Sequence, residues 1–333
     1  MLYRDFGNTG IKVSEVGFGA WAIGSNEHGN SYGLVEEKAA VEAVHKALDL
    51  GCNFFDTADL YGRGRSEEIL AKSLRGRRER TVIATKGGSD FYQGVGFQTF
   101  TPEYIRFALE KSLLRLQTDY IDIYQLHNPP IKILNNPETY DVLKILKMEG
   151  KIRAWGVSVF DHRAANRALI VGSPDSIQIP FNIFSSANTQ VISADDLTNT
   201  ETQFMSQAHR QGCAIIAREP LANGFLSGKY VDEHEFEKGD IRKHWPPNFI
   251  RARILAVKEL QFLVRENQTL AQAAIRYCLS QNDISVVIVG IKSHEQAVEN
   301  LTASQSRKLS KDELAKIAHL QNTRFGLTSS EFK

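Results

Sequence analysis

Residues 53–70 read NFFDTADLYGRGRSEEIL, and this stretch contains one complete unit of the fold that the sequence predicts. An apolar run over Cys52–Phe55 ends at Asp56, and Tyr61–Gly62 indicates a turn. A helix is then predicted to start at Ser66, whose hydroxyl group would cap it. A buried strand, a polar loop and a helix in succession are the unit from which α/β proteins are built.

Seven further apolar runs of the same kind recur along the chain, with helical periodicity between them. They are short and often β-branched, which is typical of strands buried on both faces. The eight runs are Glu15–Phe18, Cys52–Phe55, Thr81–Ala84, Ile121–Tyr124, Ala154–Val159, Ile177–Ile183, Ala214–Ala217 and Ser285–Val289. The helix predicted after the third run has Thr101 as its cap and Pro102 at its first position. Glycines that suit a helix end precede three of the runs: Gly51, Gly150 and Gly212.

Eight strands that alternate with helices predict an α/β fold of the closed (β/α)8 TIM-barrel type. The alternative is an open doubly wound sheet, whose nucleotide-binding form carries GxGxxG after the first strand. Here the first strand leads into GFGAWAIG (17–24), which has a different glycine spacing and no helix pattern. We therefore predict a single barrel domain over residues 1–333, with long loops at the carboxyl ends of the strands. The segment 3–16 predicts an N-terminal β-hairpin that covers the barrel floor.

The composition excludes several classes of function. Lys plus Arg number 40 and Asp plus Glu number 39, so no net field attracts nucleic acid or an anionic membrane. The cysteines Cys52, Cys213 and Cys278 lack CxxC spacing, which indicates neither a disulfide framework nor a metal site. No apolar run resembles a signal peptide or a membrane span. We expect a cytoplasmic protein that acts on a small molecule.

Four polar residues stand at one predicted barrel mouth, and each alone has another explanation. Asp56 is as readily a cap of the following turn, and Tyr61 is more often a packing residue. A lone Lys86 is usually a solvated strand end, and a lone His127 is more often a hydrogen-bonded structural group. Asp56, Lys86 and His127 follow three successive strands, and Tyr61 lies in the loop beyond Asp56. An unperturbed phenol titrates near 10, and a neighbouring ammonium group lowers that pKa. Lys86, held by Asp56, would make Tyr61 an acid, while a neutral His127 would orient a carbonyl. Because no side chain donates hydride, a nicotinamide or flavin must supply it.

The chain resembles the aldo-keto reductases along nearly its whole length, and most closely their bacterial stress-protein-like branch and the potassium-channel β-subunits. The resemblance is carried by YRDFGNTGIKVSEVGFGAW (3–21), FDTADLYGRGRSEEILAKSL (55–74), VIATK (82–86), LQTDYIDIYQLH (116–127), GKIRAWGVS (150–158), PLANGFLSGKY (220–230) and VGIKSHEQAVENL (289–301). It implies a TIM barrel that binds NADPH in an extended form, without a Rossmann domain.

The resemblance also implies roles for particular residues. Asp56, Tyr61, Lys86 and His127 match the catalytic tetrad, with Tyr61 as the general acid in carbonyl reduction. Ser158 and Gln178 match positions that hold the nicotinamide carboxamide, and Lys292 favours NADPH over NADH. The full cofactor set is Trp21, Asp56, Ser158, Gln178, Arg218, Pro220, Leu221, Gly224, Leu226, Ser227, Gly228, Lys229, Gly290, Lys292, Ser293, Gln296, Glu299 and Asn300.

Three residues depart from the family pattern. Val159 stands where an Asn commonly follows the serine of GVS, which would remove one hydrogen bond to the carboxamide. Arg218 stands where many members place an aromatic ring against the nicotinamide. Its planar guanidinium group can stack, and Glu219 beside it would offset its charge. Asn128 replaces a Trp that many relatives carry after the histidine.

The substrate and three alternative functions stay open at this point. Loop aromatics suit an apolar aldehyde or ketone: Trp21, Phe91, Tyr92, Phe97, Phe100, Trp245 and Phe249. Polar residues suit a sugar-like carbonyl instead: Asn26, His28, Asn30 and Asn128. The alternatives are a slow NADPH-binding redox sensor or regulatory subunit, an NAD-linked sugar or alcohol dehydrogenase, and a Schiff-base enzyme with Lys86 as nucleophile. The oligomeric state is also open.

Overall fold

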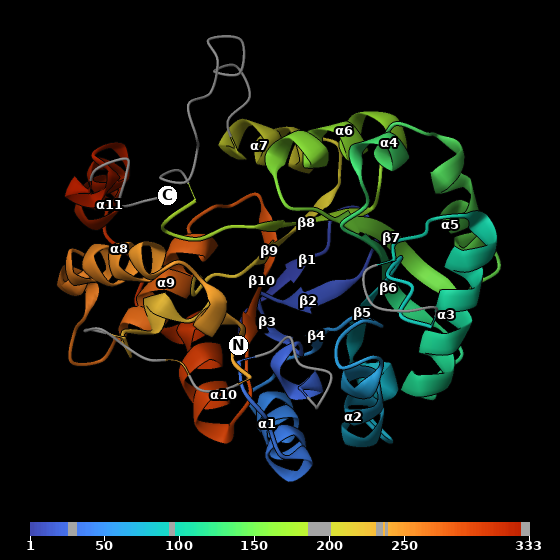
Figure 1. Cartoon of the computed structure of the whole chain (residues 1–333), viewed down its shortest axis with the longest axis horizontal. Helices are drawn as coiled ribbons and strands as arrows, with labels where there is room; N and C mark the ends of the chain where they lie inside the picture. Colours follow the sequence, from blue (N-terminus) through green and yellow to red (C-terminus); the bar gives the residue numbers. More distant parts are fainter. Residues whose placement is uncertain (26–31, 93–96, 186–200, 231–235, 237–238, 328–333) are drawn as a thin grey trace.

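Eight parallel strands close into a barrel that is surrounded by helices (Figure 1). A computed structural model describes residues 1–25, 32–92, 97–185, 201–230, 236 and 239–327. The strands are β3 (Val16–Gly19), β4 (Phe54–Asp56), β5 (Val82–Gly87), β6 (Ile121–His127), β7 (Ile152–Ser158), β8 (Ser176–Pro180), β9 (Ala214–Arg218) and β10 (Ile284–Gly290). Each predicted apolar run corresponds to one strand, and β10 closes the ring against β3. The TIM barrel predicted from the sequence is confirmed.

Helices follow the strands and pack outside the barrel. They are α1 (Glu37–Asp49), α2 (Arg65–Ser73), α3 (Pro102–Leu116), α4 (Ile131–Leu134), α5 (Glu138–Met148), α6 (His162–Gly172), α7 (Glu201–Arg210), α8 (Pro247–Lys258), α9 (Leu270–Leu279), α10 (His294–Leu301) and α11 (Lys311–Asn322). The predicted cap of α3 is confirmed, because the Thr101 side chain accepts a hydrogen bond from the backbone N–H of Tyr104. Within the described ranges, no helix has the length and apolar character needed to cross a membrane.

The prediction that Ser66 caps α2 is wrong. The helix begins one residue earlier, after Gly64, which has a φ of 95°. Ser66 lies inside the first turn, and its hydroxyl group donates instead to the carbonyl oxygen of Ala20 at 2.8 Å. The side chain therefore fastens α2 to the segment that follows β3.

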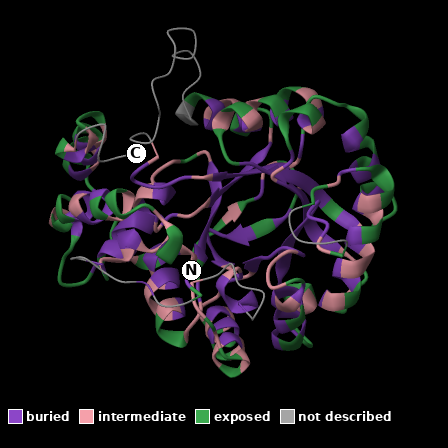
Figure 2. Cartoon of the chain, viewed as in Figure 1, coloured by how far each residue is buried: buried purple, intermediate pink, exposed green. Residues whose placement is uncertain are grey.

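Alternate residues along the barrel strands belong to the cluster inside the barrel or to the cluster among the helices, and nearly all of them are buried (Figure 2). In β4, Phe54 packs inside the barrel and Phe55 packs among the helices. This alternation explains why the strands read as nearly continuous apolar runs. Because the side-chain period of a strand is two, Asp56 continues the interior row of Phe54 up to the mouth of the barrel.

The N-terminal hairpin is present and covers the floor of the barrel. Its strands β1 (Tyr3–Asp5) and β2 (Lys12–Ser14) pair in antiparallel fashion. Phe6, Ile11 and Val13 are buried and pack against the interior residues of the barrel strands. With the floor filled by apolar side chains, polar chemistry is confined to the opposite end, where the strands terminate.

Candidate active site

Lys86 lies fully buried at the centre of the polar barrel mouth. Its ammonium group donates to Asp56 Oδ1 at 2.6 Å, to the carbonyl oxygen of Thr57 at 2.7 Å and to the phenol oxygen of Tyr61 at 3.3 Å. Burial alone would lower the pKa of Lys86, but Asp56 and Tyr61 raise it, and the net shift is upward. The lysine is thus a fixed cation at neutral pH.

Tyr61 and His127 face each other across the same space. Their rings lie 5.8 Å apart at 81°, and the Lys86 ammonium group lies 5.0 Å from the centre of the Tyr61 ring. Burial, and then the positive charges of Lys86 and Arg218, lower the pKa of His127 to about 3. His127 is therefore neutral near pH 7. Among the residues that the structure describes, its buried Nδ1 atom has no hydrogen-bond partner.

Ser158 and Gln178 extend this arrangement along neighbouring strands. The Gln178 amide donates to Asp56 Oδ2 at 2.8 Å, and the Ser158 hydroxyl donates to Gln178 Oε1 at 3.0 Å. One carboxylate, that of Asp56, therefore orients both the ammonium group of Lys86 and the amide of Gln178. An amide and a hydroxyl fixed side by side suit a ligand that carries an amide of its own.

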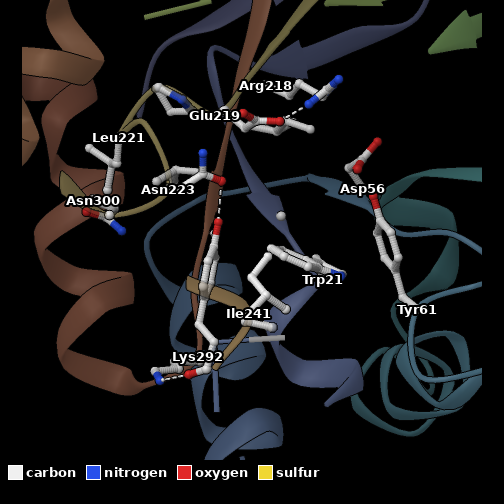
Figure 3. Close-up of a pocket in the computed structure, with 18 of the residues that line it drawn as sticks. Trp21, Asp56, Tyr61, Arg218, Glu219, Leu221, Asn223, Ile241, Lys292 and Asn300 are labelled. Atoms are coloured by element: carbon white, nitrogen blue, oxygen red, sulfur yellow. Dashed lines mark hydrogen bonds and ion pairs between the residues drawn. The ribbon is translucent and has the colours of Figure 1, made fainter. Parts of the chain in front are cut away.

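A cavity of about 590 Å³ opens over these groups. Tyr61, His127 and Asp56 line it, whereas Lys86 lies beneath them. The predicted cofactor residues that line it are Trp21, Asp56, Ser158, Gln178, Arg218, Pro220, Leu221, Gly224, Ser227, Lys229, Gly290, Lys292, Gln296, Glu299 and Asn300. In Figure 3, Asp56 and Tyr61 lie at one end of the cavity, and Lys292 and Asn300 lie at the other.

Three predicted cofactor residues are not among the described residues that line the cavity. Leu226 is buried in the apolar cluster beneath the loop, and Gly228, with a φ of 76°, ends the short helical turn there. Ser293 caps α10, because its hydroxyl group accepts from the backbone N–H of Gln296 at 3.3 Å. Each of the three is next in sequence to a residue that lines the cavity, namely Ser227, Lys229 or Lys292.

The polar groups that line the cavity are of the kinds that the predicted nicotinamide dinucleotide requires. The Ser158–Gln178 pair suits the carboxamide at one end. At the other end Lys292 directly precedes the N-terminus of α10, where backbone N–H groups and a cation together favour an anion. The Gln296 side chain fixes this turn by accepting from the backbone N–H of Lys292 at 3.0 Å.

Tyr32 lines the cavity and was missed by the sequence analysis. Its hydroxyl group donates to Asn223 Oδ1 at 2.5 Å, and its carbonyl oxygen accepts from the Lys292 ammonium group at 2.8 Å, as the dashed lines from Asn223 and Lys292 show (Figure 3). Its backbone pairs with Asp240, and the Arg242 guanidinium group lies 4.6 Å from its ring centre. We call these contacts the Tyr32 bridge. Asn223 and Lys292 follow Tyr32 by 191 and 260 positions in the sequence, and no local motif signals contacts over such separations.

The three departures from the family pattern all stand at this mouth. The side chain of Val159 is buried among the helices, while its carbonyl oxygen accepts from the Arg218 guanidinium group at 3.3 Å. Arg218 also forms an ion pair with Glu219, and burial lowers the pKa of Arg218 despite the opposing effects of Tyr61 and Asp56. Asn128 lines the cavity beside His127 with a φ of 51°.

Most of the aromatic residues predicted for a substrate pocket pack elsewhere. Of the aromatic residues predicted for the pocket, only Trp21 is among the described lining residues. Tyr32, Phe160 and Tyr230 also line the cavity, although they were not predicted for it. The other predicted aromatic residues stack on one another or lie in the core or on the surface: Phe91, Tyr92, Phe97, Phe100, Trp245 and Phe249. Asn26, His28 and Asn30 lie outside the described residues.

Comparisons with known proteins agree on one family. Residues 15–322 match the Aldo/keto reductase family. The chain is 34% identical over 304 residues to aldo-keto reductase YhdN of Bacillus subtilis (strain 168). This alignment covers 89% of this chain and 86% of YhdN. It is 30% identical over 315 residues to the NADH-specific methylglyoxal reductase of Escherichia coli (strain K12), covering 89% and 91% of the two chains.

A solved structure supports the same relationship. Aldo-keto reductase AKR11C1 from Bacillus halodurans, in its holo form, superimposes with a TM-score of 0.77 at 28% identity. The match covers 100% of both chains. The resemblance predicted from the sequence motifs is confirmed.

Proposed function

The chain belongs to the aldo/keto reductase family, and from this premise we propose that it is an NADPH-dependent oxidoreductase that reduces an aldehyde or ketone to an alcohol. Sugar-derived carbonyls are within this substrate class. The observation that carries the proposal is the placement of the Lys86 ammonium group 3.3 Å from the phenol oxygen of Tyr61, with Asp56 2.6 Å away on its other side.

The residues of the mouth divide the chemistry among them. Tyr61 donates its phenol proton to the carbonyl oxygen, and Lys86 stabilises the phenolate that remains. Asp56 keeps Lys86 charged and in place, and neutral His127 donates a hydrogen bond that orients the carbonyl. The bound nicotinamide, held by Ser158 and Gln178, would supply the hydride. In alcohol oxidation the phenolate accepts the proton.

The state of Lys86 argues against the Schiff-base alternative. A nucleophilic lysine must be neutral to attack a carbonyl, and its pKa is lowered for that purpose. The pKa of Lys86 is raised instead, and three oxygen atoms accept hydrogen bonds from its ammonium group. Borohydride reduction with a carbonyl substrate should therefore leave Lys86 unmodified.

The choice of NADPH rests on Lys292. Because a 2′-phosphate requires a cation, Lys292→Ala should weaken NADPH binding by about tenfold or more and change NADH binding by less than about twofold. Lys292→Arg retains the charge and is the matched control. Fluorescence titration with both cofactors measures the effect. Equal weakening of both would show that Lys292 supports the loop rather than the phosphate, as its bond to Tyr32 allows.

The function is tested by mixing the purified protein with NADPH and a panel of short aldehydes, ketones and reducing sugars. The proposal predicts NADPH consumption that depends on the carbonyl compound, with a smaller rate for NADH. Carbonyl-dependent consumption of NADH alone would keep the family chemistry but overturn the cofactor choice. Lack of turnover with every compound, despite tight binding of NADPH, would favour the regulatory alternative.

A further inference from the structure

Two charged side chains stand beside the proposed nicotinamide position. Arg218 ends β9, directly next to β8, which carries Gln178. Its guanidinium group forms an ion pair with Glu219 and donates to the carbonyl oxygen of Val159 at 3.3 Å, next to Ser158. The ring of Phe160 lies 5.5 Å from the same group. The guanidinium group is thus fixed against the strand ends that offer Ser158 and Gln178 to a carboxamide.

The two members of this ion pair differ in exposure. The side chain of Arg218 is 16% exposed and that of Glu219 is 35% exposed. Water screens the more exposed charge more strongly, so the negative charge of Glu219 cancels only part of the positive field that Arg218 produces inside the cavity. The second cation of the mouth, Lys86, is fully buried and is matched by buried Asp56 at 2.6 Å. The residual positive field at this end of the cavity therefore comes from Arg218.

A positive field distinguishes the two states of a nicotinamide. The ring is neutral in the reduced cofactor and carries a positive charge in the oxidised one, while the rest of the two molecules is identical. A cation beside the ring repels the oxidised form and leaves the reduced form nearly unaffected. An aromatic residue at position 218 would stack on either form without this repulsion.

We propose that the Arg218–Glu219 ion pair sets the relative affinity of the protein for reduced and oxidised cofactor, with Arg218 disfavouring NADP+ and Glu219 moderating that effect. This inference rests on the proposed function, because it requires a nicotinamide between Tyr61 and Arg218. It assigns to Arg218 a selective role that stacking alone would not give. Tighter binding of NADPH than of NADP+ would keep the protein loaded with the reduced cofactor that carbonyl reduction requires.

The test is the ratio of two dissociation constants, Kd for NADP+ divided by Kd for NADPH, measured by titration calorimetry without substrate. The wild-type ratio should exceed one. Arg218→Met, which keeps length but removes charge, should lower the ratio by about fivefold or more, and Glu219→Gln should raise it by about threefold or more. Arg218→Lys keeps the positive charge, on which the repulsion depends, and should hold the ratio within about twofold of wild type.

The ratio isolates the charge effect from damage to the loop. A substitution that merely loosens the loop weakens both cofactors equally and leaves the ratio unchanged. An unchanged ratio in Arg218→Met, or the same shift in Arg218→Met and Arg218→Lys, would overturn the inference while leaving the proposed function intact. Failure of the wild-type protein to bind either cofactor would overturn the proposed function, and this inference with it.

Discussion

Lys86 keeps its charge in a fully buried position because three oxygen atoms surround its ammonium group. An unpaired buried ammonium group is strongly unfavourable, and proteins usually avoid it by shifting the group to its neutral form. Here Asp56 provides the opposite charge at 2.6 Å, so the charged form persists. The catalytic proposal depends on this single pairing, since a neutral lysine would not stabilise a tyrosinate.

His127 gives a prediction for stability as a function of pH. Its pKa is about 3 in the folded protein, against about 6.5 when unperturbed, so between these values the unfolded chain binds a proton that the folded chain does not. The free energy of unfolding must therefore fall as pH decreases through this range, by up to about 1.4 kcal/mol per pH unit from this residue. His127→Gln should remove that contribution.

Urea unfolding between pH 4.5 and 6 measures this effect, and about one proton fewer should be taken up on unfolding of the variant. His209→Gln, at an exposed position on α7, is the matched control and should leave the slope unchanged. Identical slopes for wild type and His127→Gln would mean that His127 is not held neutral by burial.

At the residue scale, the positions that could be predicted from the sequence are the polar residues at the ends of the strands. Asp56, Lys86 and His127 could be grouped because they lie at the ends of three successive parallel strands, whose carboxyl ends meet at one mouth of the barrel. Ser66 was misassigned because a helix start is uncertain by a residue or two, and its hydroxyl group found a tertiary partner instead. The partner, Ala20, lies 46 positions away, beyond the reach of local patterns.

At the scale of elements, the loops beyond the strands decide how the cavity is enclosed. The segments after β3, β9 and β10 meet in the Tyr32 bridge, and Tyr32, Asn223 and Lys292 all line the cavity. Strands and their order could be predicted from apolar periodicity, which is strong and local. The bridge could not, because its contacts depend on how three loops close in space.

The Tyr32 bridge predicts slow release of the cofactor. Tyr32→Phe removes the hydrogen bond to Asn223 and should speed dissociation of NADPH by about fivefold, the equivalent of a net hydrogen bond of about 1 kcal/mol. Stopped-flow displacement of bound NADPH measures the rate. Tyr92→Phe is the matched control, because Tyr92 bonds to Arg115 and is not among the described lining residues. Equal rates in Tyr32→Phe and wild type would exclude a retaining role for the bridge.

At the scale of the whole molecule, the residues that stabilise the barrel floor and the polar residues proposed for catalysis lie at opposite ends of the barrel. Its floor is filled by the hairpin and apolar strand residues, and its mouth carries the polar groups. Phe6→Ala should therefore lower the free energy of unfolding by about 3 kcal/mol, because it leaves a cavity in the floor cluster. Affinity for NADPH should change by less than about twofold. Urea unfolding and cofactor titration of the same variant measure both effects.

Phe97→Ala is the control for this prediction, because Phe97 is 61% exposed and contributes little to the core. Its free energy of unfolding should stay within about 0.5 kcal/mol of wild type. A large loss of NADPH affinity in Phe6→Ala, with the protein still folded, would show that floor and mouth are coupled and would contradict the separation.

The most direct test of the proposed chemistry is single-turnover reduction of a carbonyl compound by NADPH-loaded Tyr61→Phe. The variant lacks only the phenol oxygen, so NADPH should bind with a Kd within about twofold of wild type, while the rate of reduction falls by about 100-fold or more. That result would identify Tyr61 as the proton donor beside Lys86. Near wild-type reduction by a variant that binds NADPH normally would show that the proton comes from elsewhere, and the assignment of the mouth residues would be wrong.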